Sequence, residues 1–528
     1  MQENANNSKI ISSLFLSVML DYMSFSIALP LIPFYAKYFN ASPFEVSILI
    51  GIFPAVMIFS APFWGHLSDR VGYRIALLLS IVGTGISYLW FGFATSLWML
   101  FVSRIVAGLT GSSIAISRSY VARYVDPAHR TKQFALLEAA LGVGFILGPL
   151  VTSILVGSDA DNPQLRLPSY VAAVTSCLAF IYVFWVLPKG SPIPKATSKL
   201  DSSMWEVPKY LFKILKYPMM LDLIGVITAN FLVLFGIMAI YALWTEAQLG
   251  WGAREFSNAC IGAAVVSTIF LIAFTKTASY FKEGNLVMWS FVMMGSGLLL
   301  LPFTPNLTYL VIANCLLIGG AIAANPTLYT LISKVVDANE QGKILGFVTS
   351  ISNLASLIGA AIAGFLFQTF GRHTHFIVGG SLFFLIAIFC RYRINNSRLL
   401  KIKYQRRRQK LNNLFDLFDL DKNGILQLSD FENAVTKISK LRGWKLDSQN
   451  FIMLFSFWID FGKKLQAEAD LHYLGQIKRE QWLEYLDGYL DYNFSDALIK
   501  IMDLDQDSKI AIDEFKILYK NYNKERVG

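Results

Sequence analysis

Four ionisable side chains lie within long apolar stretches of the sequence, where charges are rare. They are Asp21, Arg104, Arg118 and Glu138. An ionised group inside hydrocarbon costs several kcal/mol unless it faces water or a partner, so each of these residues is a candidate for proton or ligand handling. A carboxylate beside an arginine that approaches and withdraws can bind and release a proton, because a nearby cation stabilises the charged form.

Spacing along the predicted helices suggests which of these residues meet. A rise of about 1.5 Å per residue places Asp21 and Arg104 both at about 20 Å from the same membrane face, which predicts that they act together on a proton. Arg118 and Glu138 are equally far from Ala128, the centre of the hairpin between their helices. We therefore expect them to pair, either as a fixed ion pair that orients two helices or as part of proton or substrate handling.

Two stretches near the C-terminal end space oxygen-bearing residues as calcium loops do. The first offers Asp419, Asp421, Asn423, the backbone carbonyl of Ile425, Gln427 and Asp430. The second offers Asp503, Asp505, Asp507, the backbone carbonyl of Lys509, and Glu514. Both resemble the EF-hand loop, which takes oxygen ligands at alternate positions and a carboxylate at its end. The resemblance implies a calcium cofactor, with magnesium as an alternative in the first loop, where Asp430 replaces the longer glutamate.

A third stretch, from Asp470 to Gln481, has Gly475 and Ile477 at two characteristic loop positions but lacks most of the ligands. We expect a metal-free hand that pairs with the loop from Asp503 to Glu514. A helical module with a purely structural role is the alternative to calcium binding.

The elements that carry these residues are predicted by hydropathy. The chain has 528 residues, of which 55% are hydrophobic and 16% charged, and its mean hydropathy is +0.49. About twelve stretches are long and apolar enough to span a membrane as helices. They lie near residues 9–37, 46–64, 75–95, 98–122, 132–157, 169–187, 219–246, 256–279, 285–303, 307–333, 343–368 and 374–392. The predicted fold class is therefore an all-α polytopic membrane protein.

Composition divides the chain further. A polar stretch separates the spans into six and six, and residues 411–528 hold 20 acidic against 15 basic side chains in a chain with a net charge of +10. We expect two six-helix bundles followed by a small helical EF-hand domain. The predicted segments are an N-terminal bundle (1–188), a central loop (189–218), a C-terminal bundle (219–395), a basic linker (396–410) and the EF-hand domain (411–528).

Basic residues gather in the loops on one predicted side of the membrane. The positive-inside rule makes this side, and with it both termini, cytoplasmic. On it lies a polar turn between the second and third spans, whose gating residues would be Gly65, Asp69, Arg70, Gly72 and Arg74. The basic run from Arg391 to Lys410 follows the last span and is expected to bind anionic lipid headgroups, or simply to anchor the topology.

Several motifs together resemble the major facilitator superfamily of secondary transporters, over roughly residues 9–395. The resemblance is closest to twelve-span drug:proton antiporters of the tetracycline-exporter type. It rests on the turn at Gly65–Arg74, on Leu20-Asp21 with Pro30-Leu31-Ile32-Pro33, on the stretch Arg104 to Gly111, on Gly142-Val-Gly144 with Gly148-Pro149, and on Glu340-Gln341-Gly342 with Gly346. Two positions differ: Tyr73 replaces a basic residue of the family turn, and Ser87 replaces a carboxylate of the tetracycline exporters.

The resemblance implies the activity. We expect a proton-coupled transporter, not an enzyme, that exports small amphipathic or drug-like compounds by alternating access. Gly144, Gly148 and Pro149 would form the antiporter motif of the fifth span, and the EF-hand domain would make transport calcium-sensitive. Expected partners are a small-molecule substrate, protons and the lipid bilayer of a plasma or inner membrane, without nucleic acid and with a monomeric chain. The alternatives are a facilitator-type metabolite importer and a calcium-binding membrane scaffold that transports nothing.

Overall fold

The computed structural model describes most of the chain as two separate units, Met1–Arg398 and Leu399–Gly528. In the first unit it describes residues 2–124, 127–156, 164–187, 219–277, 280–304, 306–336 and 341–394. In the second it describes residues 412, 415–416, 419, 423, 425–430, 432–433, 436, 459, 463, 477–479, 481 and 483. The predicted central loop at 189–218 and the linker at 396–410 lie outside the described residues.

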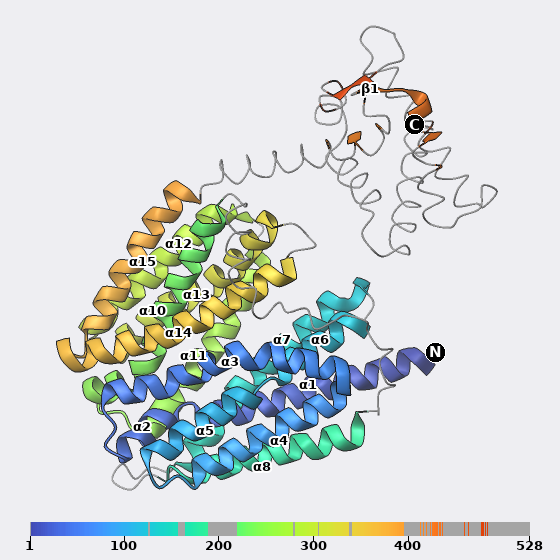
Figure 1. Cartoon of the computed structure of the whole chain (residues 1–528). Helices are drawn as coiled ribbons and strands as arrows, with labels where there is room; N and C mark the ends of the chain where they lie inside the picture. The colour runs from blue at the N-terminus through green and yellow to red at the C-terminus, as the bar shows by residue number, and fades with distance from the viewer. Residues whose placement is uncertain are drawn as a thin grey trace. The chain divides into compact units, whose positions relative to one another are not determined.

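The first half of the membrane unit contains eight described helices, which form one bundle (Figure 1). They are α1 (Gln2–Ala28), α2 (Leu31–Tyr38), α3 (Pro43–Val71), α4 (Tyr73–Gly92), α5 (Leu97–Thr110), α6 (Ser113–Tyr124), α7 (Pro127–Leu155) and α8 (Leu167–Val186). The second half forms another bundle. Its elements are α10 (Met220–Leu249), α11 (Ala253–Thr277), α12 (Glu283–Leu300), the short η3 (Leu301–Phe303), α13 (Leu307–Val335), α14 (Gln341–Phe370) and α15 (Thr374–Arg393).

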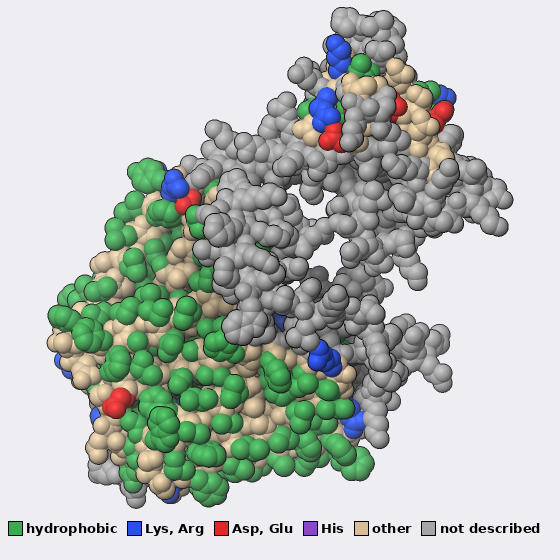
Figure 2. Space-filling view, in the orientation of Figure 1, with side chains coloured by type: hydrophobic (Ala, Val, Ile, Leu, Met, Phe, Trp, Pro, Cys, Tyr) green, Lys and Arg blue, Asp and Glu red, His purple; other side chains and the backbone are tan. Residues whose placement is uncertain are grey.

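Within these described residues, 12 helical segments are long and apolar enough to cross a membrane. This confirms the predicted number of spans and their division into six and six. Apolar side chains cover most of the flank shown in Figure 2, with few charges between them. The exposed large apolar side chains of the described residues include Phe59, Trp98, Trp185 and Trp289. A surface of this kind matches the hydrocarbon of a bilayer, so the chain is a multi-pass membrane protein.

Two spans that the sequence predicts as continuous are broken. The first is divided between α1 and α2 at Pro30, and the fourth between α5 and α6 at Gly111 and Ser112. Proline lacks a backbone N–H and its ring clashes with the preceding turn, which explains the first break. At the second, the N–H of Gly111 closes α5 by donating to the carbonyl of Ala107 at 2.7 Å.

The predicted turn at Gly65–Arg74 is mostly helix. Helix α3 continues through Gly65 and Asp69 to Val71, and α4 begins at Tyr73, so the chain reverses at Gly72 alone. Gly72 has φ +90° and ψ 150°, a backbone conformation that is essentially confined to glycine. The sequence prediction placed the change of direction correctly but made it too long, because the polar side chains before Gly72 continue the helix.

The two bundles meet along α3 and α14 and along α7 and α11. At one end, which we call the Lys37 end, polar and aromatic side chains join them. Lys37 pairs with Glu246 at 2.5 Å, Ser153 donates to Asn258 at 2.6 Å, and the ring centroids of Phe34 and Phe256 are 6.1 Å apart.

We call the opposite end, where α3 is followed by α4, the Gly72 end. A side chain added at Gly142, near the middle of α7, or at Gly346, near the start of α14, would have no atom within 4 Å. The described contacts therefore join the halves at the Lys37 end, in an arrangement closed at that end.

The second unit contains one described pair of strands. Strand β1 (Ile425–Leu426) pairs antiparallel with β2 (Ile477–Lys478), and Leu426 lies opposite Ile477. The first predicted calcium loop is therefore bound to the stretch from Asp470 to Gln481. This corrects the sequence prediction, which paired that stretch with the loop from Asp503 to Glu514, a loop that lies outside the described residues.

Candidate functional site

Asp21 is enclosed in the first bundle. Its side chain is 6% exposed, and the hydroxyl of Ser113, at the start of α6, donates to its Oδ2 at 2.5 Å. The other carboxylate oxygen, Oδ1, has no hydrogen-bond partner within the described structure. A buried carboxylate with one unsatisfied oxygen is costly while it is ionised, and a proton removes most of that cost.

Arg104 is also enclosed, but its surroundings are aromatic. It is 1% exposed, and its guanidinium carbon lies 4.8 Å from the ring centroid of Phe91 and 5.8 Å from that of Tyr88. Its Nε and Nη2 groups have no hydrogen-bond partner among the described residues. Cation–π contacts of this kind stabilise a desolvated guanidinium by about 2 kcal/mol.

Asp21 and Arg104 therefore do not form the predicted pair. The partner of Asp21 is Ser113, which follows Arg104 by nine residues, or roughly 13 Å of helix. Asp21 is therefore level with Ser113 and not, as the depth calculation from the sequence predicted, with Arg104. Tyr88 is within electrostatic range of both groups.

Arg118 and Glu138 do form an ion pair, between α6 and α7. Their side chains are 50% and 51% exposed. Arg118 lies six residues before the end of α6 at Tyr124, and Glu138 lies eleven residues after the start of α7 at Pro127. Half-exposed charges are favourable only against water or headgroups, so this pair faces water or headgroups rather than hydrocarbon.

The glycines of the antiporter motif, Gly144 and Gly148, lie where α7 packs closely against α1. We call this helix contact the seam. A side chain added at Gly144 would lie 2.9 Å from the backbone of Met19 and Met23, on either side of Asp21. A side chain added at Gly148 would meet the hydroxyl of Ser26 and, at 2.7 Å, the backbone nitrogen of Ile27. Pro149 lies inside α7 and is buried. The seam therefore positions the helix that carries Asp21.

Hydrogen bonds close this seam. The hydroxyl of Ser26 donates to the carbonyl of Gly144 at 2.7 Å, and the hydroxyl of Thr152 donates to the carbonyl of Ile27 at 2.8 Å. Both bonds need the close backbone approach that the glycines permit.

The gating residues lie at the Gly72 end. Arg74 donates to the carbonyl of Phe184 in α8, and its guanidinium carbon is 5.3 Å from the ring of the same residue. In this arrangement Arg74 therefore binds within its own bundle. Arg70 is exposed, whereas the burial of Gly65 and the side chain of Asp69 lie outside what the structure describes.

The second bundle offers uncharged hydrogen-bonding groups. Asn230 of α10 donates to Asn325 of α13 at 2.8 Å. Tyr241 and Asn314 of the same two helices bond at 2.9 Å. These hydrogen bonds join α10 to α13.

In the second unit, the described part of the first calcium loop is ordered by its own acidic residues. Asp419, which is 4% exposed, accepts the N–H of Asn423 at 3.0 Å. Asp430, which is 9% exposed, accepts the N–H of Gln427 at 2.7 Å. The other predicted ligands Asp421, Asp503, Asp505, Asp507, Lys509 and Glu514 lie outside the described residues.

At the start of the predicted basic run, Arg393 of α15 pairs with Asp222 of α10 at 3.2 Å. This contact fixes the end of the last span against the seventh. Residues 395–411 lie outside the described part of the chain.

Sequence reasoning missed Ser113, the partner of Asp21, because a lone serine beside Gly111 has no distinctive spacing. It also missed the enclosure of Arg104 by Phe91. Neither could be found without knowing which faces of the helices meet.

Comparison with known proteins agrees with this architecture. The family model of the Major Facilitator Superfamily matches residues 14–280 and 223–462. The tetracycline resistance protein, class B, of Escherichia coli is 27% identical over 385 residues, which cover 70% of this chain and 91% of that protein. The quinolone resistance protein NorA of Staphylococcus aureus is 24% identical over 367 residues, which cover 68% of this chain and 90% of that one.

Solved structures show the same fold. The human organic anion transporter MFSD10 superposes with a TM-score of 0.57 at 18% identity, over 72% of this chain and 99% of that one. The nucleoside transporter NupG superposes with a TM-score of 0.61 at 12% identity, over 73% of this chain and all of that one in its mutant structure. The family model covers more than half of the chain, and the twelve spans form two bundles as the resemblance implied. The chain therefore belongs to the Major Facilitator Superfamily.

Proposed function

We propose that the chain is a proton-coupled exporter of small amphipathic, drug-like compounds, with Asp21 as the proton carrier. The observation that carries the proposal is the enclosed carboxylate of Asp21, which has one hydrogen bond from Ser113 and one unsatisfied oxygen. While the carboxyl group is enclosed, its protonated form has the lower free energy. When the transporter opens to water, the group can release that proton, because water stabilises the carboxylate. This cycle couples conformational change to proton movement.

The division of charge between the halves supports the proposal. The enclosed acid and base, Asp21 and Arg104, both belong to the first bundle. In the described spans of the second bundle, the acidic and basic side chains lie near the ends, as Asp222, Glu246 and Lys334 do. The second bundle instead offers amide and hydroxyl groups, which suit an uncharged or weakly charged amphipathic substrate.

Direction and orientation belong to the proposal as well. The excess of basic loop residues supports a cytoplasmic location for the Gly72 end and for both termini. The arrangement closed at the Lys37 end is then the inward-facing one, ready to take a substrate from the cytoplasm or the inner leaflet. The resistance functions named for the tetracycline and quinolone relatives favour export.

The experiment uses the full-length chain in proteoliposomes with an imposed pH gradient. Tetracycline, a fluoroquinolone and ethidium serve as probes. We expect Asp21→Asn to abolish gradient-driven accumulation while exchange of probe between the two sides continues, because the uncharged amide cannot carry a proton. The matched control is Asp222→Asn, which removes a carboxylate from the end of a span and should retain accumulation.

Accumulation by Asp21→Asn equal to that of the unmodified chain would remove Asp21 from the mechanism. Transport that ignores the pH gradient in the unmodified chain would favour the facilitator-type importer. The scaffold alternative gains support if two results are found together. None of the probes is transported, and cells that carry substitutions of Asp21 and Arg104 keep the function that the unmodified chain gives them.

We further propose that the second unit binds calcium through the loop from Asp419 to Asp430, and that calcium alters the transport cycle. Three observations favour this. Asp419 accepts the N–H of Asn423, Asp430 accepts the N–H of Gln427, and strand β1 pairs with β2. In a calcium loop, such bonds hold the first and last ligands in place. The coordinating groups would be side-chain oxygens of Asp419, Asn423 and Asp430 and the carbonyl of Ile425, and magnesium is the competitor.

Terbium luminescence and calorimetry on the full-length chain test this site. Asp419→Asn should weaken binding at least tenfold, whereas Asp416→Asn, which removes a carboxylate paired with Arg479, should not. Asp430→Glu should favour calcium over magnesium, because the longer arm can bind with both oxygens. Equal binding by all of these variants would refute the site, and transport unchanged by micromolar calcium would leave binding without a regulatory role.

A further inference from the structure

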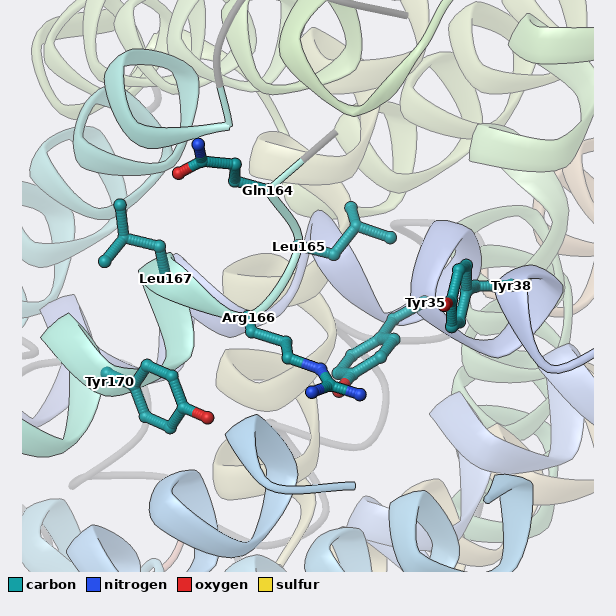
Figure 3. Close-up of a pocket in the computed structure, with 7 residues that line it drawn as sticks. All are labelled: Tyr35, Tyr38, Gln164, Leu165, Arg166, Leu167 and Tyr170. Atoms are coloured by element: carbon teal, nitrogen blue, oxygen red, sulfur yellow. The ribbon is translucent and has the colours of Figure 1, made fainter. Parts of the chain in front are cut away.

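A cavity of about 360 Å³ opens at the Lys37 end of the first bundle, away from Asp21 and the seam of α1 and α7. Figure 3 shows that its walls come from α2 and from the start of α8 with the segment before it. It is lined by Tyr35, Tyr38, Gln164, Leu165, Arg166, Leu167 and Tyr170. Its size falls within the range of small-molecule sites, which begins at about 300 Å³.

Hydrogen bonds to the backbone hold two of the tyrosines that line the cavity. The hydroxyl of Tyr35 donates to the carbonyl of Ala94 at 3.0 Å, and the hydroxyl of Tyr170 donates to that of Gly92 at 3.0 Å. Both carbonyls belong to the end of α4 and the loop that follows. Because these hydroxyl protons are used, the remaining donors at the cavity belong to Arg166, Gln164 and the exposed Tyr38.

The charge that the described lining residues give the cavity comes from Arg166 and is positive. Arg166 lies within hydrogen-bonding range of the Tyr35 hydroxyl and makes a long hydrogen bond from Nη2 to the carbonyl of Ala94 at 3.5 Å. It forms no ion pair with a described residue. Among the described residues, no acidic side chain lines the cavity. A guanidinium has five N–H donors, so most of its hydrogen-bonding capacity remains for a ligand. Helix α8 begins at Leu167, and the positive end of its dipole adds to the same field.

We propose that this cavity is a binding site for an anion with an apolar body. Arg166 binds the carboxylate, sulfonate or phosphate group, for which its planar fork is suited. Tyr38 and Tyr170 contact the apolar or aromatic part. The ligand comes either from solution, as an aromatic acid, or from the bilayer, as the headgroup of an anionic lipid.

This proposal does not depend on proton coupling, since none of the lining residues takes part in the site around Asp21. Its rival is a purely structural role, in which Arg166 fastens α8 to the end of α4 through Ala94. A structural role predicts a change in stability without any dependence on ligand charge.

The test measures equilibrium binding to the full-length chain in nanodiscs of phosphatidylcholine. The probes are 2-naphthalenesulfonate and its uncharged analogue 2-naphthol. We expect Arg166→Gln to weaken binding of the sulfonate at least tenfold and Tyr38→Leu to weaken it severalfold, with little change for 2-naphthol. Arg254→Gln removes a cation from the same end of the other bundle and should have no effect. Thermal unfolding establishes that each variant is folded. If Arg166→Gln does not fold, the binding measured with Tyr38→Leu still tests the proposal.

A second arm identifies the source of the ligand. If phosphatidylglycerol in the nanodiscs displaces the sulfonate from the unmodified chain, the natural ligand is a lipid headgroup, and if it does not, the ligand is a soluble anion. The proposal is overturned if the sulfonate binds Arg166→Gln and Tyr38→Leu as tightly as it binds the unmodified chain, or if 2-naphthol binds equally well and with the same dependence on Arg166.

Discussion

At the scale of single residues, His373 connects the loop before α15 to the end of α10. Trp244 of α10 donates to its Nδ1 at 3.3 Å, and Arg372 donates to its Nε2 at 3.3 Å. A neutral imidazole has one acceptor nitrogen, so one of the two bonds forms at a time, and a protonated ring can accept neither. Partial burial, and then the charge of Arg372, hold the pKa of His373 below its usual value of 6.5.

The sign of the resulting pH dependence follows from this lowered pKa. Between the ordinary pKa of 6.5 and the lower folded value, the unfolded chain binds more protons than the folded one, so stability falls as the pH falls through this window. We expect His373→Gln to lose less thermal stability than the unmodified chain between about pH 7.5 and about pH 5.5. Equal losses in the two proteins would show that the lowered pKa has no effect on stability.

The identities of the enclosed acid and base could be predicted from the sequence, but their partners could not. Hydropathy alone identifies Asp21 and Arg104 as ionisable groups in apolar segments. Their contacts with Ser113 and Phe91 depend on the break between α5 and α6 and on how each helix is rotated. The hairpin that brings Arg118 to Glu138 is local, and its symmetry about Ala128 was sufficient to predict that pair.

At the scale of elements, the seam between α1 and α7 allows a matched comparison within one helix. Gly148 is enclosed by Ser26 and Ile27, whereas Gly142 has no neighbour within 4 Å of an added side chain. Gly148→Ala should therefore destabilise the chain by about 1–3 kcal/mol through overpacking. Gly142→Ala should be neutral or stabilising by up to about 1 kcal/mol, because alanine favours helix.

Thermal unfolding of the two purified variants measures this difference. Equal effects of the two substitutions would show that the seam is not as tight as the structure describes. Because Met19 and Met23 line the same seam on either side of Asp21, we expect Gly148→Ala also to impair proton-driven accumulation more than Gly142→Ala does.

The positions of the spans were predictable, whereas their internal breaks were not. A run of about 20 apolar residues identifies a span regardless of its neighbours. By contrast, Gly65 and Asp69 were predicted to lie in a turn because polar residues and glycines often do so, yet α3 continues through both. The decisive residue was Gly72, whose positive φ no pattern of polarity reveals.

At the scale of the whole membrane unit, the Lys37 end joins the two bundles through Lys37 and Glu246. Their side chains are 55% and 30% exposed, so the pair contributes at most about 1 kcal/mol. This amount can shift a balance between two conformations by about fivefold. Lys37→Glu should therefore favour opening at this end, and Lys37→Glu combined with Glu246→Lys should restore closure.

Spin labels on Thr95→Cys and Arg254→Cys, in a chain without its native cysteines, report the distance between the bundles at the Lys37 end. We expect a longer component in Lys37→Glu and its loss in the double variant. If the double variant opens as far as the single one, attraction between these two charges is not what holds this end closed.

The most direct test of proton-coupled transport is a measurement of proton movement itself. A pH-sensitive dye inside proteoliposomes records the lumenal pH after addition of a transported probe, such as tetracycline or ethidium, without an imposed gradient. We predict that the probe drives proton movement in the opposite direction through the unmodified chain and not through Asp21→Asn. Probe transport without any proton movement, or equal proton movement in Asp21→Asn, would contradict the account.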